Sequence, residues 1–364
     1  MWLEVDESLV DLYPILNESQ CAGLEAIALS VFHGKNSLFA KKRTLDWMMN
    51  QELSSAAKSV CLRVKNRLSE YSSLRDFLVL KILIVGSNRI LHYDDEGFWE
   101  LPLRILEENP VVTCSLLTEN LSDADIYLIA AEHYKKHIKL NGLITNLTPF
   151  GGGGNQIYPA FKRFIDRKES FCFSITDTDR DYPTAESNET SKNCRSLAEE
   201  RIWVADHLDV PARELENILP INLVEDAIFD DRGSVDLHER FEKIKSRIAD
   251  QPMALLFCDL KMGTKFAWAS THHGNQEKAR FWREFINSIN PPLHNCGNGC
   301  ENDCECFLIE SLGEKVAEKF LDFCKKNSIQ KQYERMKTSA NSDKWLEVGK
   351  AVFNWGVATP RSRS

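Results

Sequence analysis

The feature that most constrains the fold of this chain is a short apolar run, Phe171 to Thr176, which stops abruptly at Asp177. Its aromatic and β-branched residues favour a strand, and neither of its two alternating faces carries a charge. A strand of this kind is typical of a parallel sheet that is covered by helices on both sides. The run therefore predicts a buried strand whose carboxyl end is marked by the pair Asp177 and Asp179.

Two strand–helix repeats precede this strand. The expected elements are a strand over Val111 to Thr118, a helix over Asp123 to Lys139, a strand over Leu143 to Leu147 and a helix over Gln156 to Lys168. Because crossovers between strands of one sheet are right-handed, this β-α-β-α-β order predicts three parallel strands. We therefore expect an α/β fold with a central parallel sheet flanked by helices, a mostly helical N-terminal region and a small Cys-rich C-terminal region.

Acidic residues follow the first and third of these strands. Glu119 comes after the first, and Asp177 and Asp179 come after the third. Parallel strands end along one edge of a sheet, where ligands collect in α/β proteins. Carboxylate oxygens are the ligands that Mg²⁺ and Mn²⁺ prefer, so the three side chains are predicted to form one cation site. The alternative is a solvated acidic loop that merely ends a strand.

Four glycines, Gly151 to Gly154, follow the expected second strand at the same edge. Glycines allow backbone N–H groups to approach a phosphate closely, or they allow a tight turn and nothing more. The loop lacks a Gly-Lys-Ser/Thr ending, which argues against a nucleotide-hydrolysing P-loop. The candidate cofactor- or phosphate-binding residues are Gly152, Gly153 and Asn155.

Two motifs in this region resemble those of the Toprim domain. Residues 116–123 read Leu-Leu-Thr-Glu-Asn-Leu-Ser-Asp, and residues 175–179 read Ile-Thr-Asp-Thr-Asp. The domain is shared by type IA and II topoisomerases, bacterial primases and the OLD-type and PARIS-type nucleases of phage defence. Asn120 stands where the family usually has Gly, and Arg180-Asp181 follows the second motif without the downstream Gly of topoisomerases. Both departures favour the defence nucleases, and the resemblance covers about residues 110–265.

The resemblance implies a divalent-metal-dependent nuclease that hydrolyses phosphodiester bonds of DNA or RNA, with Mg²⁺ or Mn²⁺ held by Glu119, Asp177 and Asp179. It also implies that Glu216, or secondarily Glu214, adds a metal ligand, although a solvated helix face explains them equally well. Lys261 follows an expected strand over Met253 to Leu260 and could neutralise charge on the cleaved phosphodiester. Its alternative is an ordinary exposed lysine. The implied setting is the effector subunit of a prokaryotic antiphage system with an ABC-type ATPase partner.

A Cys-rich stretch near residue 300 is a second candidate metal site. Its four thiols are enough for tetrahedral Zn²⁺, with His294 in the same stretch. The spacing departs from the Cys-x₂-Cys of common zinc ribbons, so a cluster of free, oxidisable thiols is the alternative. The candidate zinc ligands are Cys296, Cys300, Cys304 and Cys306.

Composition sets the remaining limits. The 364 residues carry a formal net charge of −9, so nucleic-acid contact would need a local patch, a bound cation or a partner subunit. The chain shows neither a signal peptide nor a long apolar span, and its 11 Cys are scattered, which favours a reducing cytoplasm and no membrane. The oligomeric state is open.

The expected division has three parts. Residues 1–109 form an accessory or partner-binding region with one hairpin, residues 110–265 the Toprim-like catalytic domain, and residues 266–364 a region with the Cys-rich loop and helices. The rival functions are a catalytically silent Toprim-like scaffold and a zinc-containing regulatory subunit that binds nucleic acid or protein.

Overall fold

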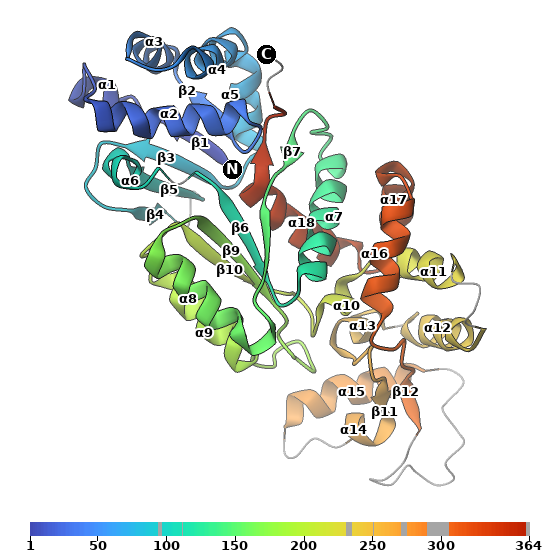
Figure 1. Cartoon of the computed structure of the whole chain (residues 1–364). Coiled ribbons are helices and arrows are strands. Elements are labelled where there is room, and N and C mark those ends of the chain that lie inside the picture. Colours follow the sequence, from blue (N-terminus) through green and yellow to red (C-terminus); the bar gives the residue numbers. More distant parts are fainter. Residues whose placement is uncertain are drawn as a thin grey trace. The chain divides into compact units, whose positions relative to one another are not determined.

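The elements of the chain alternate between helices and mostly parallel strands (Figure 1). The computed structural model describes residues 1–93, 97–110, 112–230, 235–249, 251–270, 275–289 and 306–361. The fold class is α/β, with parallel-rich sheets flanked by helices. Contacts divide the chain into two compact units. Unit 1 comprises Met1–Ile175, Asn193–Leu208 and Gly349–Ser364, and unit 2 comprises Thr176–Lys192 and Asp209–Val348.

The first sheet of unit 1 has five strands in the order β2-β1-β3-β5-β4. The strands are β1 (Trp2–Val5), β2 (Ser37–Ala40), β3 (Lys81–Val85), β4 (Leu91–Tyr93) and β5 (Phe98–Pro102). The β4–β5 pair is antiparallel, which confirms the expected hairpin, and the other pairs are parallel. The helices of this region are α1 (Ser8–Leu12), α2 (Glu18–Phe32), α3 (Lys42–Asn50), α4 (Ser55–Asn66), α5 (Leu68–Phe77) and α6 (Leu103–Glu108).

The sequence interpretation missed strands β1 and β2. A charged residue, Glu4, interrupts the apolar pattern of β1, yet its side chain is buried. Its carboxylate accepts hydrogen bonds from Trp2 Nε1 and Arg75 Nε, each at 2.8 Å. A buried carboxylate with two donors is tolerated inside a sheet, so a hydropathy pattern alone underestimates such a strand.

The second sheet of unit 1 has the order β10-β9-β6-β8. Its strands are β6 (Cys114–Thr118), β8 (Thr148–Gly151), β9 (Phe171–Thr176) and β10 (Ala205–Asp209). Both β8 and β9 run parallel to β6, and β9 is buried along its whole length. This confirms the buried parallel strand expected over Phe171 to Thr176. The carboxyl ends of β6, β8 and β9 lie along one edge of the sheet.

The expected strand over Leu143 to Leu147 is wrong in its position. The strand that joins this sheet is β8, which contains Pro149, whereas β7 (Ile144–Thr145) pairs antiparallel with β13 (Val357–Ala358). Because β8 is an edge strand, Pro149 can occupy it without removing a hydrogen bond from a second neighbour. The proline was therefore a misleading stop signal.

Helices cover both faces of the second sheet. They are α7 (Leu121–His137), α8 (Ile157–Arg167), the short 3₁₀ helix η1 (Gly154–Gln156), and the parts of α9 (Glu189–Glu199) and α18 (Ser342–Gly356) that belong to unit 1. On one face, Phe173 stacks on Trp355 of α18 with ring centroids 5.3 Å apart. On the other, Phe161 of α8 lies 6.4 Å from His207 of β10. The central strands β6 and β9 are thus buried on both sides, as their apolar residues require.

Unit 2 is mostly helical. Its helices are α10 (Leu215–Ile218), α11 (Ile221–Asp230), α12 (Val235–Ile248), α13 (Met253–Phe257), α14 (Phe266–Ser270), α15 (Gln276–Ser288), α16 (Val316–Lys326) and α17 (Ile329–Met336). The short strands β11 (Thr264–Lys265) and β12 (Phe307–Ile309) pair antiparallel. The strand expected over Met253 to Leu260 is wrong, because α13 occupies most of it. Its Met, Ala and Leu are good helix formers, and a short apolar run fits either element.

Candidate functional site

Glu119 and the glycine loop lie side by side in unit 1. Gly152 N donates a hydrogen bond to Thr118 O at 2.7 Å, and Gly153 N donates to Glu119 O at 2.9 Å. Gly153 has φ 74°, a left-handed conformation, and a Cβ at Gly152 would lie 2.7 Å from Ile157 Cα. The glycines are therefore required to close the turn against the end of β6. Both N–H groups donate hydrogen bonds to carbonyls of the chain itself. Phosphate binding by Gly152, Gly153 and Asn155 of η1 therefore stays a prediction.

The Asp-x-Asp turn belongs to unit 2 and is fastened to the segment before α10. The N–H groups of Thr178 and Asp179 both donate to Arg213 O, at 3.0 and 2.9 Å. Asp177 Oδ1 accepts a hydrogen bond from Leu215 N at 2.8 Å. Asp179 adopts φ 55°, a left-handed conformation that Asp tolerates better than most residues. The turn and the segment Arg213 to Leu215 therefore form one polar frame.

Asn188 braces the turn from its other side. Its Nδ2 donates to Asp177 O at 3.1 Å and to Asp179 Oδ2 at 2.7 Å. Sequence reasoning missed this residue, since a lone Asn eleven positions after Asp177 carries no pattern. One hydrogen bond holds the backbone of Asp177 and the other holds the Asp179 carboxylate.

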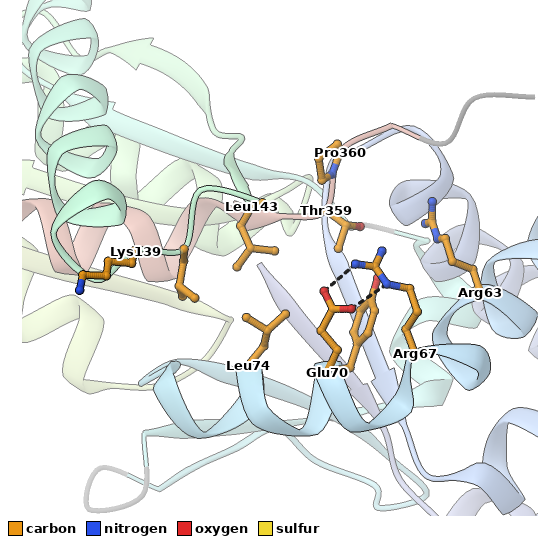
Figure 2. Close-up of a pocket in the computed structure, with 11 residues that line it drawn as sticks. Arg63, Arg67, Glu70, Leu74, Lys139, Leu143, Thr359 and Pro360 are labelled. Carbon is orange, nitrogen blue, oxygen red and sulfur yellow. Dashed lines mark hydrogen bonds and ion pairs between the residues drawn. The ribbon is translucent and has the colours of Figure 1, made fainter. Parts of the chain in front are cut away.

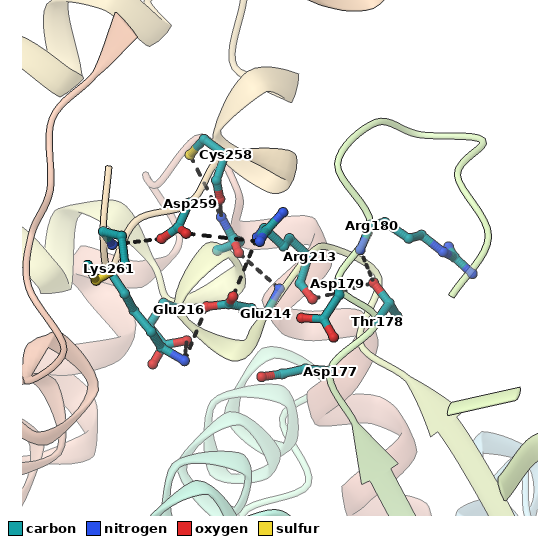
Figure 3. Close-up of polar contacts among 12 residues, drawn as sticks. Asp177, Thr178, Asp179, Arg180, Arg213, Glu214, Glu216, Cys258, Asp259 and Lys261 are labelled. Atoms are coloured by element: carbon teal, nitrogen blue, oxygen red, sulfur yellow. Dashed lines mark hydrogen bonds and ion pairs between the residues drawn. The ribbon is translucent and has the colours of Figure 1, made fainter. Parts of the chain in front are cut away.

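Lys261 bridges the two glutamates of α10 and its cap (Figure 3). Its Nζ lies 3.1 Å from Glu214 Oε2 and 3.2 Å from Glu216 Oε2. Glu216 is only 7% exposed. Within the described part of the chain its Oε2 accepts no hydrogen bond, so the contact with Lys261 is ionic. The structure thus brings Lys261 and Glu216, two residues singled out from the sequence, into direct contact.

The charges of this cluster shift the pKa values of both partners. Burial raises the pKa of Glu216, and the nearby Lys261 opposes that effect. Burial on its own would lower the pKa of Lys261, but the carboxylates of Glu216, Glu214 and Asp177 more than offset it and leave the pKa above its ordinary value. Lys261 is therefore a permanent cation near neutral pH and not a general base.

Two further residues complete the cluster, and sequence reasoning missed both. Arg213 Nε lies 3.4 Å from Glu214 Oε1, and Arg213 Nη2 lies 4.0 Å from Asp259 Oδ2. Asp259 Oδ1 in turn accepts a hydrogen bond from Met262 N at 2.7 Å, which shapes the turn that carries Lys261. Their positions in the sequence could have indicated them, because Arg213 directly precedes Glu214 and Asp259 lies two residues before Lys261.

The donor chemistry of this cluster suits Mg²⁺ or Mn²⁺, but its present geometry does not. Across the described ranges, no three His, Cys, Asp or Glu side chains are placed to hold one ion. The reasons are visible in unit 2, where Asp177 accepts the amide of Leu215 and Lys261 lies between the two glutamates. Glu119 belongs to unit 1, so the expected gathering of Glu119, Asp177 and Asp179 stays a prediction.

The predicted zinc ligands fall almost entirely outside the described residues. Cys296, Cys300 and Cys304 lie in the undescribed range 290–305. Cys306 is half-buried, and its carbonyl accepts a hydrogen bond from Phe266 N at 2.9 Å at the start of the β11–β12 region. The zinc site stays a prediction.

Comparison with protein-family models, with curated proteins and with solved structures found no match for this chain. Among the helices in the described ranges, none combines the length and the apolar character needed to cross a membrane.

Proposed function

We propose that this chain is a divalent-metal-dependent nuclease of the Toprim type, a cytoplasmic effector subunit of an antiphage system that acts with an ABC-type ATPase partner. The observation that carries the proposal is the cluster around Lys261, in which a permanent cation contacts Glu214 and the buried Glu216 beside Asp177. Buried, mutually dependent charges in a small cluster are costly for stability and are typical of functional sites.

The residues of the cluster have separable roles in this proposal. Lys261 supplies positive charge for a phosphodiester group, as cationic side chains do at transferring phosphoryl groups. Arg213 and Asp259 are positioning residues, since they orient Glu214 and the turn that carries Lys261. The dependence on Mg²⁺ or Mn²⁺ rests on the resemblance of the two strand-ending motifs. Glu119, Asp177, Asp179 and Glu216 are the candidate ligands.

An aromatic surface with one arginine in unit 1 supports nucleic acid as the substrate. Phe150 of β8 is 44% exposed and meets Phe164 of α8 edge to face, with ring centroids 5.2 Å apart. The two rings, Gly152, the exposed Arg163 and one carboxylate, that of Glu169, line a cavity of about 360 Å³. Exposed aromatic rings beside basic side chains are how proteins stack and hold single-stranded bases. In a chain of net charge −9, this patch offers the local contact that nucleic acid needs.

The charge pairing favours a second candidate function, a catalytically silent scaffold. Lys261 already forms ion pairs with Glu214 and Glu216, and Asp177 already accepts the first amide of α10. A protein that uses these groups for stability alone would show the same contacts.

A cleavage assay on matched variants separates the two functions. Asp177→Asn and Lys261→Met should each lower cleavage of DNA or RNA by about 10²-fold or more, because the first removes a candidate metal ligand and the second removes the cation proposed to act on the reacting phosphate. Asp236→Asn is the control, since Asp236 is an exposed carboxylate of α12 that pairs with Arg240. The assay compares Mg²⁺, Mn²⁺ and chelator, with and without the neighbouring ATPase. A reconstituted wild type that cleaves neither polymer, or an Asp177→Asn variant as active as wild type, contradicts the nuclease proposal.

A further inference from the structure

Lys261 contacts two carboxylates at once. Its Nζ lies 3.1 Å from Glu214 Oε2 and 3.2 Å from Glu216 Oε2. Arg67 and Glu70, which line a cavity in unit 1, show an ordinary surface pair, with one cation on one carboxylate and both side chains 52% exposed (Figure 2). Surface pairs of that kind add little to stability. Lys261 differs, because a single cation is shared by two carboxylates that are mostly buried.

The two glutamates are held in place by α10. Glu214 N donates a hydrogen bond to Asn217 Oδ1 at 2.9 Å, and the side chain of Asn217 is buried. Asn217 Nδ2 in turn donates to Leu255 O at 2.7 Å and to Cys258 O at 2.8 Å, which anchors the helix. Glu216 lies in the same short helix. The two Oε2 atoms are therefore presented from a backbone that buried hydrogen bonds fix.

Lys261 is the member of the contact that has room to leave. Its side chain is 33% exposed, against 13% for that of Glu214 and 7% for that of Glu216. The backbone beneath it is fixed, since Ser311 Oγ donates a hydrogen bond to Lys261 O. The four-carbon stem of a lysine is flexible, so the ammonium group can swing into solvent without any change in the turn.

The two Oε2 atoms suit a divalent cation as well as an ammonium group. Carboxylate oxygens are the ligands that Mg²⁺ and Mn²⁺ prefer. Glu216 Oε2 is buried and accepts no hydrogen bond from the described residues, so binding a metal ion would break none. Asp177 adds a third carboxylate that interacts electrostatically with Lys261. Because the ammonium and a metal ion are both positive and need the same two oxygens, they compete for them.

We propose that Lys261 takes the place of a divalent cation between Glu214 and Glu216, and that the two cations exclude each other. The inference rests on the metal dependence of the proposed function and adds a regulation to it. In the state that the structure shows, the protein's own lysine closes the metal site. When Mg²⁺ or Mn²⁺ takes the two oxygens, the ammonium group is released and becomes available to a phosphodiester group.

Lysine labelling of the wild-type full chain tests this exchange. Amines are methylated reductively in Mg²⁺ or in NaCl of the same ionic strength, because salt alone weakens ion pairs. Mass spectrometry of the peptides then gives the labelling rate of each lysine. Lys261 should react several-fold faster in Mg²⁺, since the neutral amine is the reactive form and the two carboxylates favour the charged form. Lys245, which pairs with Glu225, is the control and should react equally in both.

A second measurement follows the binding of Mn²⁺, whose electron paramagnetic resonance signal reports the free ion. Lys261→Met should bind Mn²⁺ about tenfold more tightly than wild type, because a site that is closed in most molecules loses affinity by the open fraction. Lys261→Arg keeps a cation and should bind as weakly as wild type. Adding Glu216→Gln to Lys261→Met should cancel the gain. Lys245→Met removes the same charge from another ion pair of unit 2 and should have no effect.

Three results would overturn the inference. They are equal labelling of Lys261 in Mg²⁺ and NaCl, a Lys261→Met variant that binds Mn²⁺ no more tightly than wild type, and a gain in affinity that survives Glu216→Gln. If Lys261→Met does not fold, labelling of the wild type decides. Neither measurement needs cleavage. Release of Lys261 without cleavage would keep the exchange and remove the nuclease, whereas cleavage without release would do the reverse.

Discussion

At the scale of single residues, the informative group is Glu216, a carboxylate enclosed by protein and balanced by Lys261. Its raised pKa has a definite consequence for stability. A carboxyl whose pKa is higher in the folded than in the unfolded protein stabilises the fold while it is protonated. That contribution is present below the unfolded value near 4.5 and is lost as pH rises through the folded pKa.

Glu216→Gln should therefore change stability in a pH-dependent way. Near pH 7 the neutral amide avoids the burial of a charge, so the free energy of unfolding should stay equal to that of wild type or rise by about 1 kcal/mol. Near pH 4 the wild-type carboxyl is itself mostly protonated, and the difference should shrink. Urea unfolding at both pH values measures this, with Glu242→Gln on the exposed face of α12 as the control. A variant that is destabilised by several kcal/mol at pH 7 would show instead that the Lys261 contact dominates.

At the scale of elements, prediction succeeded where a strand had apolar residues on both faces and a clear stop. β9 was located because Asp177 ends its apolar run. β6 and α7 were located because Glu119 ends the first strand and the acidic Asp123 marks the first turn of the helix that follows. These signals are local, so a sequence carries them.

Prediction failed where tertiary context decides the outcome. β8 contains Pro149 and is possible only as an edge strand. β1 was missed because Glu4 is charged although its side chain is buried. α13 was predicted as a strand because its residues are all apolar. For the site, the Lys261 contact with Glu214 and Glu216 joins residues more than forty positions apart. The sequence motifs identified Lys261, Glu214 and Glu216 as site residues. Their pairing, however, depends on the turn that Asp259 stabilises.

The glycine loop gives a matched test at this scale. In Gly152→Ala the new methyl group would lie 2.7 Å from Ile157 Cα, so β8 or α8 must shift, and we expect a loss of about 1–3 kcal/mol in unfolding free energy. Gly142→Ala is the control, because a Cβ there meets no atom within 4 Å and its φ is not left-handed. That change should be neutral or stabilise by up to about 1 kcal/mol. Equal melting temperatures for the two variants would contradict the close packing of the loop.

At the scale of the whole molecule, the cysteines divide into two classes. Of the 11 Cys in the chain, eight lie in the described ranges, where none of them forms a disulfide, and the remaining three are Cys296, Cys300 and Cys304. Six of the eight are buried, and burial raises the pKa of Cys61, Cys114 and Cys324 to about 12. Buried thiols with such values react slowly, because the thiolate is the reactive form.

Thiol labelling of the native protein can therefore report on the Cys-rich stretch almost alone. If Cys296, Cys300, Cys304 and Cys306 hold one structural Zn²⁺, protein purified without added zinc should contain about one Zn²⁺ per chain, and native labelling should reach about one thiol, the half-buried Cys21. A strong chelator should then release the ion and expose about four more thiols, because metal-bound thiolates are shielded until the metal leaves. Cys306→Ser should lower zinc content, whereas Cys61→Ala, at a buried residue of α4, should not. Protein without zinc whose four thiols react at once would establish the alternative of free, oxidisable thiols and exclude a structural Zn²⁺ at this stretch.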